Sequence, residues 1–196
     1  MFIAFEGLDG SGSSTQSRML AVKLEAQGHA VLQTKEPTNN THIGKLIREI
    51  LQRKWECSSV GLQLLFSADR AEHLKNEIEP ALKNGQIVIT DRYFFSTIAY
   101  GSLTVDDWFW LKSLGKHFRV PDITFLFKLD PAICIERIAG RGSDFELFEQ
   151  HEKLEKIWKG YERLAREYQN IKLIDASKSI EMIAEEIWRE VSGKLI

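Results

Sequence analysis

Cysteine is scarce in this chain of 196 residues, which contains only Cys57 and Cys134. The two lie far apart and form no C-x-x-C pair, so they suit a reducing cytosol better than a disulfide scaffold. The five histidines are scattered singly along the chain and indicate no metal cluster. The sequence therefore predicts a fold that is held together by its core and not by disulfides or a structural metal.

Long apolar runs and an excess of basic charge are also missing. No apolar segment approaches the roughly 18 residues that a membrane-spanning helix needs, and the first residues show no basic lead of a signal peptide. The formal net charge of −2 gives no argument for a nucleic-acid partner. We therefore expect one cytoplasmic domain over residues 1–196, with neither a membrane nor a nucleic acid as its partner.

Five short, nearly continuous apolar segments alternate with amphipathic ones. The expected strands cover residues 1–7, 30–37, 86–91, 122–130 and 171–177. The expected helices cover residues 13–28, 42–52, 59–82, a segment from about 94, a segment from about 105, 132–140, about 149–168 and 179–191. This alternation predicts an α/β fold in which helices cover both faces of a five-stranded parallel sheet. Ligands of such sheets bind beyond the carboxyl ends of the strands.

The segment from Phe5 to Gln16, FEGLDGSGSSTQ, has the spacing of a phosphate-binding loop. Gly7, Gly12 and Ser14 match the pattern G-x-x-x-x-G-K-[ST], but position 13 is serine where the pattern has lysine. Glycines let the backbone amides converge on phosphate oxygens, and the following helix adds the partial positive charge of its first turn. The expected phosphate-binding residues are Gly7, Leu8, Asp9, Gly10, Ser11, Gly12, Ser13, Ser14 and Thr15.

A second candidate site follows the third expected strand, where Asp91 and Arg92 are adjacent. A carboxylate at the end of a strand beside the first strand can hold Mg²⁺, and Ser14 supplies a hydroxyl of the kind that also ligates this ion. Arg92 provides a planar fork that suits a phosphate group. We expect Ser14 and Asp91 as the metal ligands and Mg²⁺ as the cofactor.

At this point the chain resembles a known family. FEGLDGSGSSTQ, KEP, LLFSADRAEHL, DRYFFSTIAY, PDITFLFKLDP and IDASKSIE occur in the order in which thymidylate kinases have them, from residue 1 to about 190. The resemblance implies a P-loop NTPase-type three-layer sandwich with a short lid at about 137–149. It also implies a homodimer that uses ATP and Mg²⁺ to convert dTMP to dTDP.

The resemblance also implies roles for individual residues. Phe66 is expected to stack on thymine, Arg70 to donate to a thymine carbonyl, and Tyr100 to lie against the sugar, where it would disfavour ribonucleotides. The dTMP-binding residues implied are Asp9, Glu36, Pro37, Arg48, Phe66, Arg70, Arg92, Ser96 and Tyr100. The catalytic residues implied are Asp9, Arg92, Arg137 and Arg141. Lys178 is expected near the adenine of ATP.

The chain lacks basic residues at positions where many members of the family have arginine or lysine. Many relatives carry an arginine where this chain has Gly10 or Asn39, and Ser13 cannot balance phosphate charge as a lysine would. We expect the lid arginines, Arg137 and Arg141, to compensate. An active dTMP kinase is the leading interpretation. The alternatives are a kinase for another nucleoside monophosphate, such as dUMP or a cytidine nucleotide, and a nucleotide-binding protein with weak catalysis or none.

Overall fold

A computed structural model of the chain describes residues 1–139 and 151–195. The strands are β1 (Phe2–Gly7), β2 (Val31–Lys35), β3 (Ile87–Asp91), β4 (Ile123–Lys128) and β5 (Ile171–Asp175). All their pairings are parallel, and the spatial order is β2-β3-β1-β4-β5. The five-stranded parallel sheet predicted from the sequence is confirmed.

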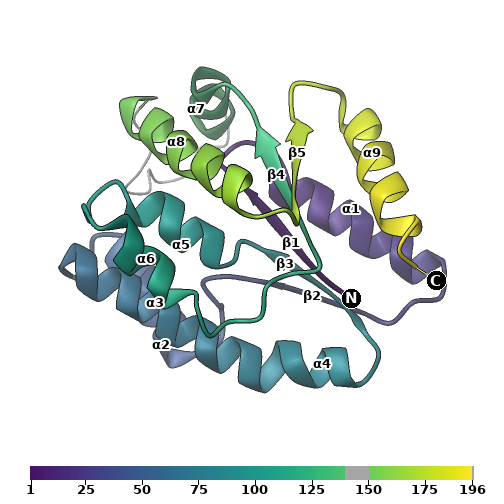
Figure 1. The fold of residues 1–196 in the computed structure, drawn as a ribbon, viewed down its shortest axis with the longest axis horizontal. Helices are drawn as coiled ribbons and strands as arrows, with labels where there is room; N and C mark the ends of the chain where they lie inside the picture. Colours follow the sequence, from purple (N-terminus) through teal and green to yellow (C-terminus); the bar gives the residue numbers. More distant parts are fainter. Residues whose placement is uncertain (140–150, 196) are drawn as a thin grey trace.

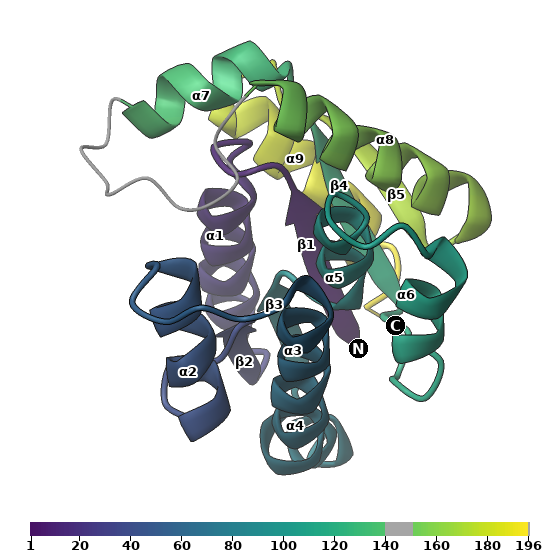
Figure 2. The same ribbon diagram turned by 90° about the vertical axis from the view of Figure 1, so that its left-hand side faces the viewer.

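Helices cover this sheet on both faces (Figure 1). The helices in the described residues are α1 (Ser13–Ala26), α2 (His42–Leu51), α3 (Ser59–His73), the π-helical segment η1 (Leu74–Ile78), α4 (Glu79–Lys83), α5 (Phe94–Gly101), α6 (Trp108–Leu114), α7 (Pro131–Ala139), α8 (His151–Glu167) and α9 (Ile180–Ser192). Helices α1 and α9 pack together on one face of the sheet, and α3, α5 and α8 lie on the other (Figures 1 and 2). The predicted three-layer α/β arrangement is therefore confirmed.

Two helices differ from the sequence prediction. The single helix expected over residues 59–82 contains the π-helical segment η1 between α3 and α4. Pro80 lies two residues after this segment. Because proline has no amide hydrogen and crowds the preceding turn, it favours a widened turn before it. The helix expected from about Val105 begins at Trp108, because the Asp107 side chain caps it by accepting from the Trp110 amide at 2.8 Å.

The core is centred on β1, whose six residues are all buried. This strand has neighbours on both sides and helices on both faces, which explains why its sequence is a continuous apolar run and not an alternating one. The Phe5 ring packs against Phe125 and Phe127 of β4, with centroids 5.4 and 5.9 Å away. This packing fixes the strand from which the glycine-rich loop emerges.

The register of the sheet gathers the polar candidates at its carboxyl edge. Asp91 lies opposite Phe5 of β1 and also opposite Lys35 of β2. The end of β3 therefore stands between the start of the glycine-rich loop and the end of β2. The proposed lid falls largely on residues 140–150, which lie outside the described residues.

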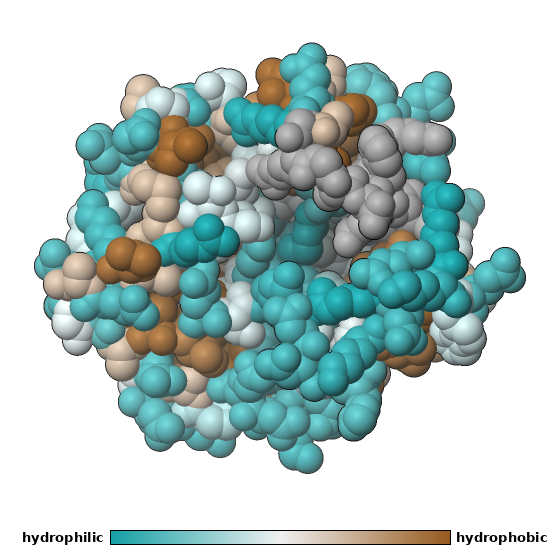
Figure 3. Space-filling model, turned by 180° about the vertical axis from the view of Figure 1, so that it is seen from behind, coloured by the Kyte–Doolittle hydropathy of each residue, from teal (hydrophilic) through white to brown (hydrophobic). Residues whose placement is uncertain are grey.

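No helix among the described residues is long and apolar enough to cross a membrane. Seen from behind, the surface is largely hydrophilic, and its hydrophobic side chains form separate groups (Figure 3).

Candidate active site

The glycine-rich loop leads directly from β1 into α1. Gly10 and Gly12 have φ angles of 82° and 99°, a left-handed conformation that side chains disfavour. Helix α1 begins at Ser13, and no side chain in the described part of the chain caps its first amides. The Ser11 hydroxyl is buried without a hydrogen-bond partner in the part of the chain that the structure describes. Open amides, the positive end of a helix dipole and a spare hydroxyl together favour a bound phosphate.

Two serine hydroxyls of this helix start face the carboxylate of Asp91. Ser14 Oγ donates to Asp91 Oδ2 at 2.5 Å, and Ser13 Oγ donates to Asp91 Oδ1 at 3.2 Å. The predicted pairing of Ser14 with Asp91 is thus present in the geometry. Ser13, which replaces the loop lysine, is 93% buried and directed at a carboxylate.

Arg92 lies at the centre of a hydrogen-bonded network. Its Nη2 is 2.6 Å from Asp9 Oδ1 and donates to the Tyr100 hydroxyl at 3.1 Å, while Nη1 donates to Ser96 Oγ at 3.0 Å. Burial acts to lower the pKa of Arg92, but Asp9 and neighbouring oxygens raise it, and the result lies well above its ordinary value. The Arg92 guanidinium therefore stays charged in a fixed orientation between the loop and α5.

Glu6, near the end of β1, accepts hydrogen bonds from side chains of this network. Its carboxylate accepts from the Ser96 and Tyr161 hydroxyls at 2.5 and 2.9 Å and from the Tyr93 amide at 2.9 Å. Burial is the main influence on this group, and it raises the pKa of Glu6 to about 7, although the hydrogen bonds and Arg92 act in the opposite direction. Glu6 thus joins β1, α5 and α8 at one point.

A cavity next to Arg92 brings together most of the residues that the sequence assigned to dTMP. It is lined by Asp9, Glu36, Pro37, Leu51, Gln63, Phe66, Arg70, Arg92, Tyr93, Ser96, Thr97 and Tyr100. The Arg70 side chain is only 2% exposed, and it donates to Glu36 Oε2 at 2.7 Å and to Thr97 Oγ1 at 2.9 Å. Phe66 and Arg70 therefore reach the same cavity from α3, as their spacing predicts.

Of the residues assigned to dTMP, Arg48 does not line this cavity, and Lys178, assigned to ATP, lies elsewhere. Arg48 Nη2 donates to the carbonyls of Pro37 and Thr38 at 2.7 and 2.5 Å, so it holds the segment after β2. The Lys178 ammonium donates to Glu186 at 2.8 Å on the exposed surface near the end of β5. The roles of Arg48 as a phosphate clamp and of Lys178 near adenine remain predictions.

Helix α7 packs on the glycine-rich loop. A Cβ atom at Gly10 would lie 2.6 Å from the Cys134 carbonyl oxygen, so only glycine fits here without a shift. Arg137 Nη1 donates to the Gly10 carbonyl at 3.4 Å. One of the two lid arginines is thus beside the loop, whereas Arg141 lies outside the described residues.

Sequence reasoning missed several residues that organise the site, namely Glu6, Asp69, His73, Thr97 and Tyr161. A charged residue at the end of a buried apolar strand was a usable signal for Glu6. The Tyr161 hydroxyl reaches Glu6 across 155 positions, so no local pattern could place it. Asp69 accepts from the amide and the hydroxyl of Thr38 at 2.7 and 2.6 Å, and so orders the segment after β2.

Comparison with known proteins agrees with the geometry over nearly the whole chain. The family model described as thymidylate kinase matches residues 5–187. A protein of Treponema pallidum (strain Nichols) named for thymidylate kinase activity is 42% identical, with 95% of this chain and 92% of that protein covered. One from Methanocaldococcus jannaschii is 41% identical, with 95% and 93% covered. One from Thermococcus onnurineus (strain NA1) is 38% identical, with 100% and 99% covered. The chain belongs to the thymidylate kinase family.

Proposed function

We propose that this protein transfers the γ-phosphoryl group of ATP to dTMP, giving dTDP and ADP. The observation that carries the proposal is that Arg92, bonded to Asp9 of the phosphate-binding loop, lines a cavity together with most of the residues assigned to dTMP. In the reaction, an oxygen of the dTMP phosphate forms a bond to the γ-phosphorus, and the bond from that phosphorus to the β–γ bridging oxygen breaks. Arg92 is oriented to hold the acceptor phosphate near the loop.

The cavity chemistry supports a pyrimidine deoxynucleotide as the acceptor. Phe66 offers a flat apolar face on which a base can stack. Arg70 provides a guanidinium that is already oriented by Glu36 and Thr97, and a thymine carbonyl is a suitable acceptor for it. Tyr100 is held through its contacts with Arg92 and Asp9, at the place expected for the sugar.

Mg²⁺ fits the residues at the end of β3. Ser14 and Asp91 supply one hydroxyl and one carboxylate, and Mg²⁺ is commonly held by one or two carboxylates together with waters and substrate phosphates. When bound, the ion neutralises phosphate charge. Ser14 and Asp91 would hold it next to the loop.

Three further assignments follow from the family. Arg137 would add charge at the loop from the side of α7, with Arg141 as its partner in the lid. The active form would be a homodimer. The protein would work in the cytoplasm, where ATP and dTMP are supplied.

The test is an assay of ADP release with ATP and a panel of nucleoside monophosphates: dTMP, dUMP, CMP, dCMP, AMP and GMP. We expect dTMP to give the largest kcat/KM, and chelation of Mg²⁺ to abolish the signal. A preference for another monophosphate would contradict the assigned acceptor. ADP release that does not depend on any acceptor would contradict the transfer reaction.

A further inference from the structure

The phosphate-binding loop carries no cationic side chain. Residues 7–15 contain neither lysine nor arginine, and Ser13 is buried against Asp91 Oδ1 at 3.2 Å. The nearest acidic groups, Asp9 and Asp91, add negative charge on either side. Besides Mg²⁺, a triphosphate on this loop would therefore need its cationic side chain from another element, because the loop itself supplies only amides and hydroxyls.

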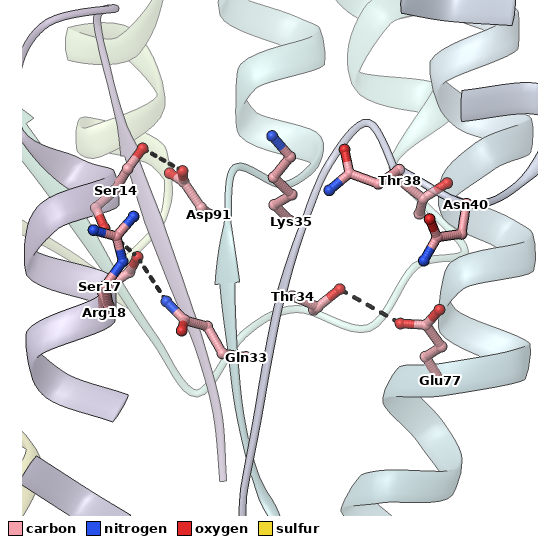
Figure 4. Close-up of a pocket in the computed structure, with 11 residues that line it drawn as sticks. Ser14, Ser17, Arg18, Gln33, Thr34, Lys35, Thr38, Asn40, Glu77 and Asp91 are labelled. Atoms are coloured by element: carbon pink, nitrogen blue, oxygen red, sulfur yellow. Dashed lines mark hydrogen bonds between the residues drawn. The ribbon is translucent and has the colours of Figure 1, made fainter. Parts of the chain in front are cut away.

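A polar cavity of about 580 Å³ opens beside Ser14 and Asp91 (Figure 4). Its walls come from α1, β2, the segment after β2, η1 and the end of β3. The lining residues are Ser14, Ser17, Arg18, Gln33, Thr34, Lys35, Thr38, Asn39, Asn40, Glu77 and Asp91. Two of these side chains are cations, Arg18 and Lys35, and the family assignment gives a role to neither.

Lys35 approaches the loop from a different element than Arg18 does. It ends β2 and lies directly opposite Asp91 in the register of the sheet, so the two strand ends are adjacent. Arg18 lies one helical turn beyond Ser14, farther from the start of α1, where the open amides are. In Figure 4 the Lys35 side chain extends between Asp91 and Thr38.

The Lys35 ammonium is also uncommitted. It has no hydrogen bond or ion pair with any residue that the structure describes, and the side chain is exposed. The next residue, Glu36, points away to Arg70 and the dTMP cavity, as the alternation of side chains along an extended chain requires. Lys35 therefore stands on the loop side of the strand end with a flexible stem and three free donors.

We propose that Lys35 takes the place of the missing loop lysine, with its ammonium contacting oxygens of the γ-phosphoryl group during transfer. The charge approaches from the end of β2, on the side of Ser14 and Asp91, whereas Arg137 approaches the same loop at Gly10 from α7. This inference rests on the proposed function, since it assumes that a phosphoryl group is transferred from a triphosphate on this loop.

The experiment compares wild type with Lys35→Met, Lys35→Arg and the double variant Ser13→Lys/Lys35→Met. Single-turnover transfer from γ-labelled ATP is measured at saturating ATP and dTMP. We expect Lys35→Met to slow transfer by about 10- to 100-fold, the size of one charge-assisted contact, with dTMP affinity unchanged. Lys35→Arg should retain part of the rate. The double variant should recover at least about tenfold over Lys35→Met, because a lysine at position 13 supplies the same charge from the loop.

Lys83→Met is the matched control, since Lys83 is an exposed lysine at the end of α4, outside both cavities. It should transfer at the wild-type rate. A rate for Lys35→Met within twofold of wild type would overturn the proposal, and so would a slow Lys35→Met that Ser13→Lys does not improve. If wild type prefers another monophosphate, the proposed function fails, but the same variants assayed with that acceptor still decide the role of Lys35.

Discussion

Arg92 occupies a backbone conformation that few residues other than glycine adopt, with φ at 71°. Such a conformation costs on the order of 1–3 kcal/mol and persists only where surrounding contacts enforce it. Here the Arg92 amide donates to the Phe5 carbonyl at 2.9 Å, and Thr90 Oγ1 donates to the Arg92 carbonyl at 2.8 Å. The strained turn sends the guanidinium toward Asp9. The backbone strain therefore lies at Arg92, the residue that we propose to sit between the two substrates.

Asp91 should matter for turnover much more than for dTMP binding, because it faces the two serines of the loop and does not line the dTMP cavity. Asp91→Asn keeps the shape of the side chain but removes its charge. We expect kcat with Mg²⁺ to fall by at least about 10- to 100-fold, the size of one charge-assisted contact, while the dTMP Kd from calorimetry stays within about twofold of wild type. Asp106→Asn, at an exposed loop position, should change neither quantity. Near-normal turnover of Asp91→Asn would rule out a metal role for this carboxylate.

Arg70 should contribute to both stability and base recognition. Arg70→Ala removes the guanidinium that pairs with buried Glu36 and leaves His73 Nδ1 as its neighbour at 3.1 Å, and breaking a buried ion pair typically costs about 3–5 kcal/mol. The same variant should weaken dTMP binding by about 1–3 kcal/mol and leave ATP binding nearly unchanged. Urea unfolding and calorimetry measure the two effects.

The double variant Glu36→Gln/Arg70→Ala serves as the control for Arg70. It removes the unpaired charge, so it should be more stable than Arg70→Ala alone. Equal weakening of ATP and dTMP by Arg70→Ala would contradict the assignment of Arg70 to the base.

Among the secondary-structure elements, the junction of β1, α5 and α8 orders the acceptor side of the site. Glu6 holds it by accepting from Tyr93, Ser96 and Tyr161. The unfolded chain should titrate this carboxyl near its ordinary pKa of 4.5, whereas burial raises the pKa in the folded protein to about 7. Between these values only the folded state holds the proton. The contribution of Glu6 to stability is therefore complete below about pH 4.5 and is lost as the pH rises through 7.

Glu6→Gln should remove this pH dependence, because an amide does not titrate. Its oxygen can still accept from the Tyr93 amide, and its NH₂ group can donate to the hydroxyl oxygens of Ser96 and Tyr161. Relative to the variant, the free energy of unfolding of wild type should fall by up to about 3 kcal/mol between about pH 4.5 and pH 7.5. Urea unfolding at several pH values measures the difference between the two proteins. Their other titrating groups are the same, so the contributions of those groups cancel in this difference. Parallel pH profiles for the two proteins would show that the Glu6 carboxyl is not perturbed by folding.

At the scale of the whole molecule, the sequence predicted those features that short stretches of neighbouring residues determine. The central strands β1, β3 and β4 are nearly continuous apolar segments, and the glycine-rich loop has Gly10 and Gly12 at left-handed positions, so strand, loop and helix follow from neighbouring residues. The i, i+4 spacing of Phe66 and Arg70 predicted one shared face of α3, and both residues line one cavity.

The features that escaped prediction are contacts between distant parts of the chain. Arg70 could be read as a free donor for thymine, yet it is already bonded to Glu36, 34 positions away. Arg48 could be read as a phosphate clamp, yet it binds two carbonyls of the segment after β2. Lys35 could be considered from the sequence as one of several possible compensating cations, but only the register shows that it lies opposite Asp91. Such pairings depend on strand order and helix packing, which a local pattern does not determine.

The central claim is that a site without the loop lysine still transfers a phosphoryl group to dTMP. The most direct measurement is a quenched single turnover of the wild-type protein with γ-labelled ATP, Mg²⁺ and dTMP, followed by separation of the nucleotides. We expect the label to leave ATP and to appear in dTDP. Label that stays in ATP, or that appears only as inorganic phosphate, would contradict it.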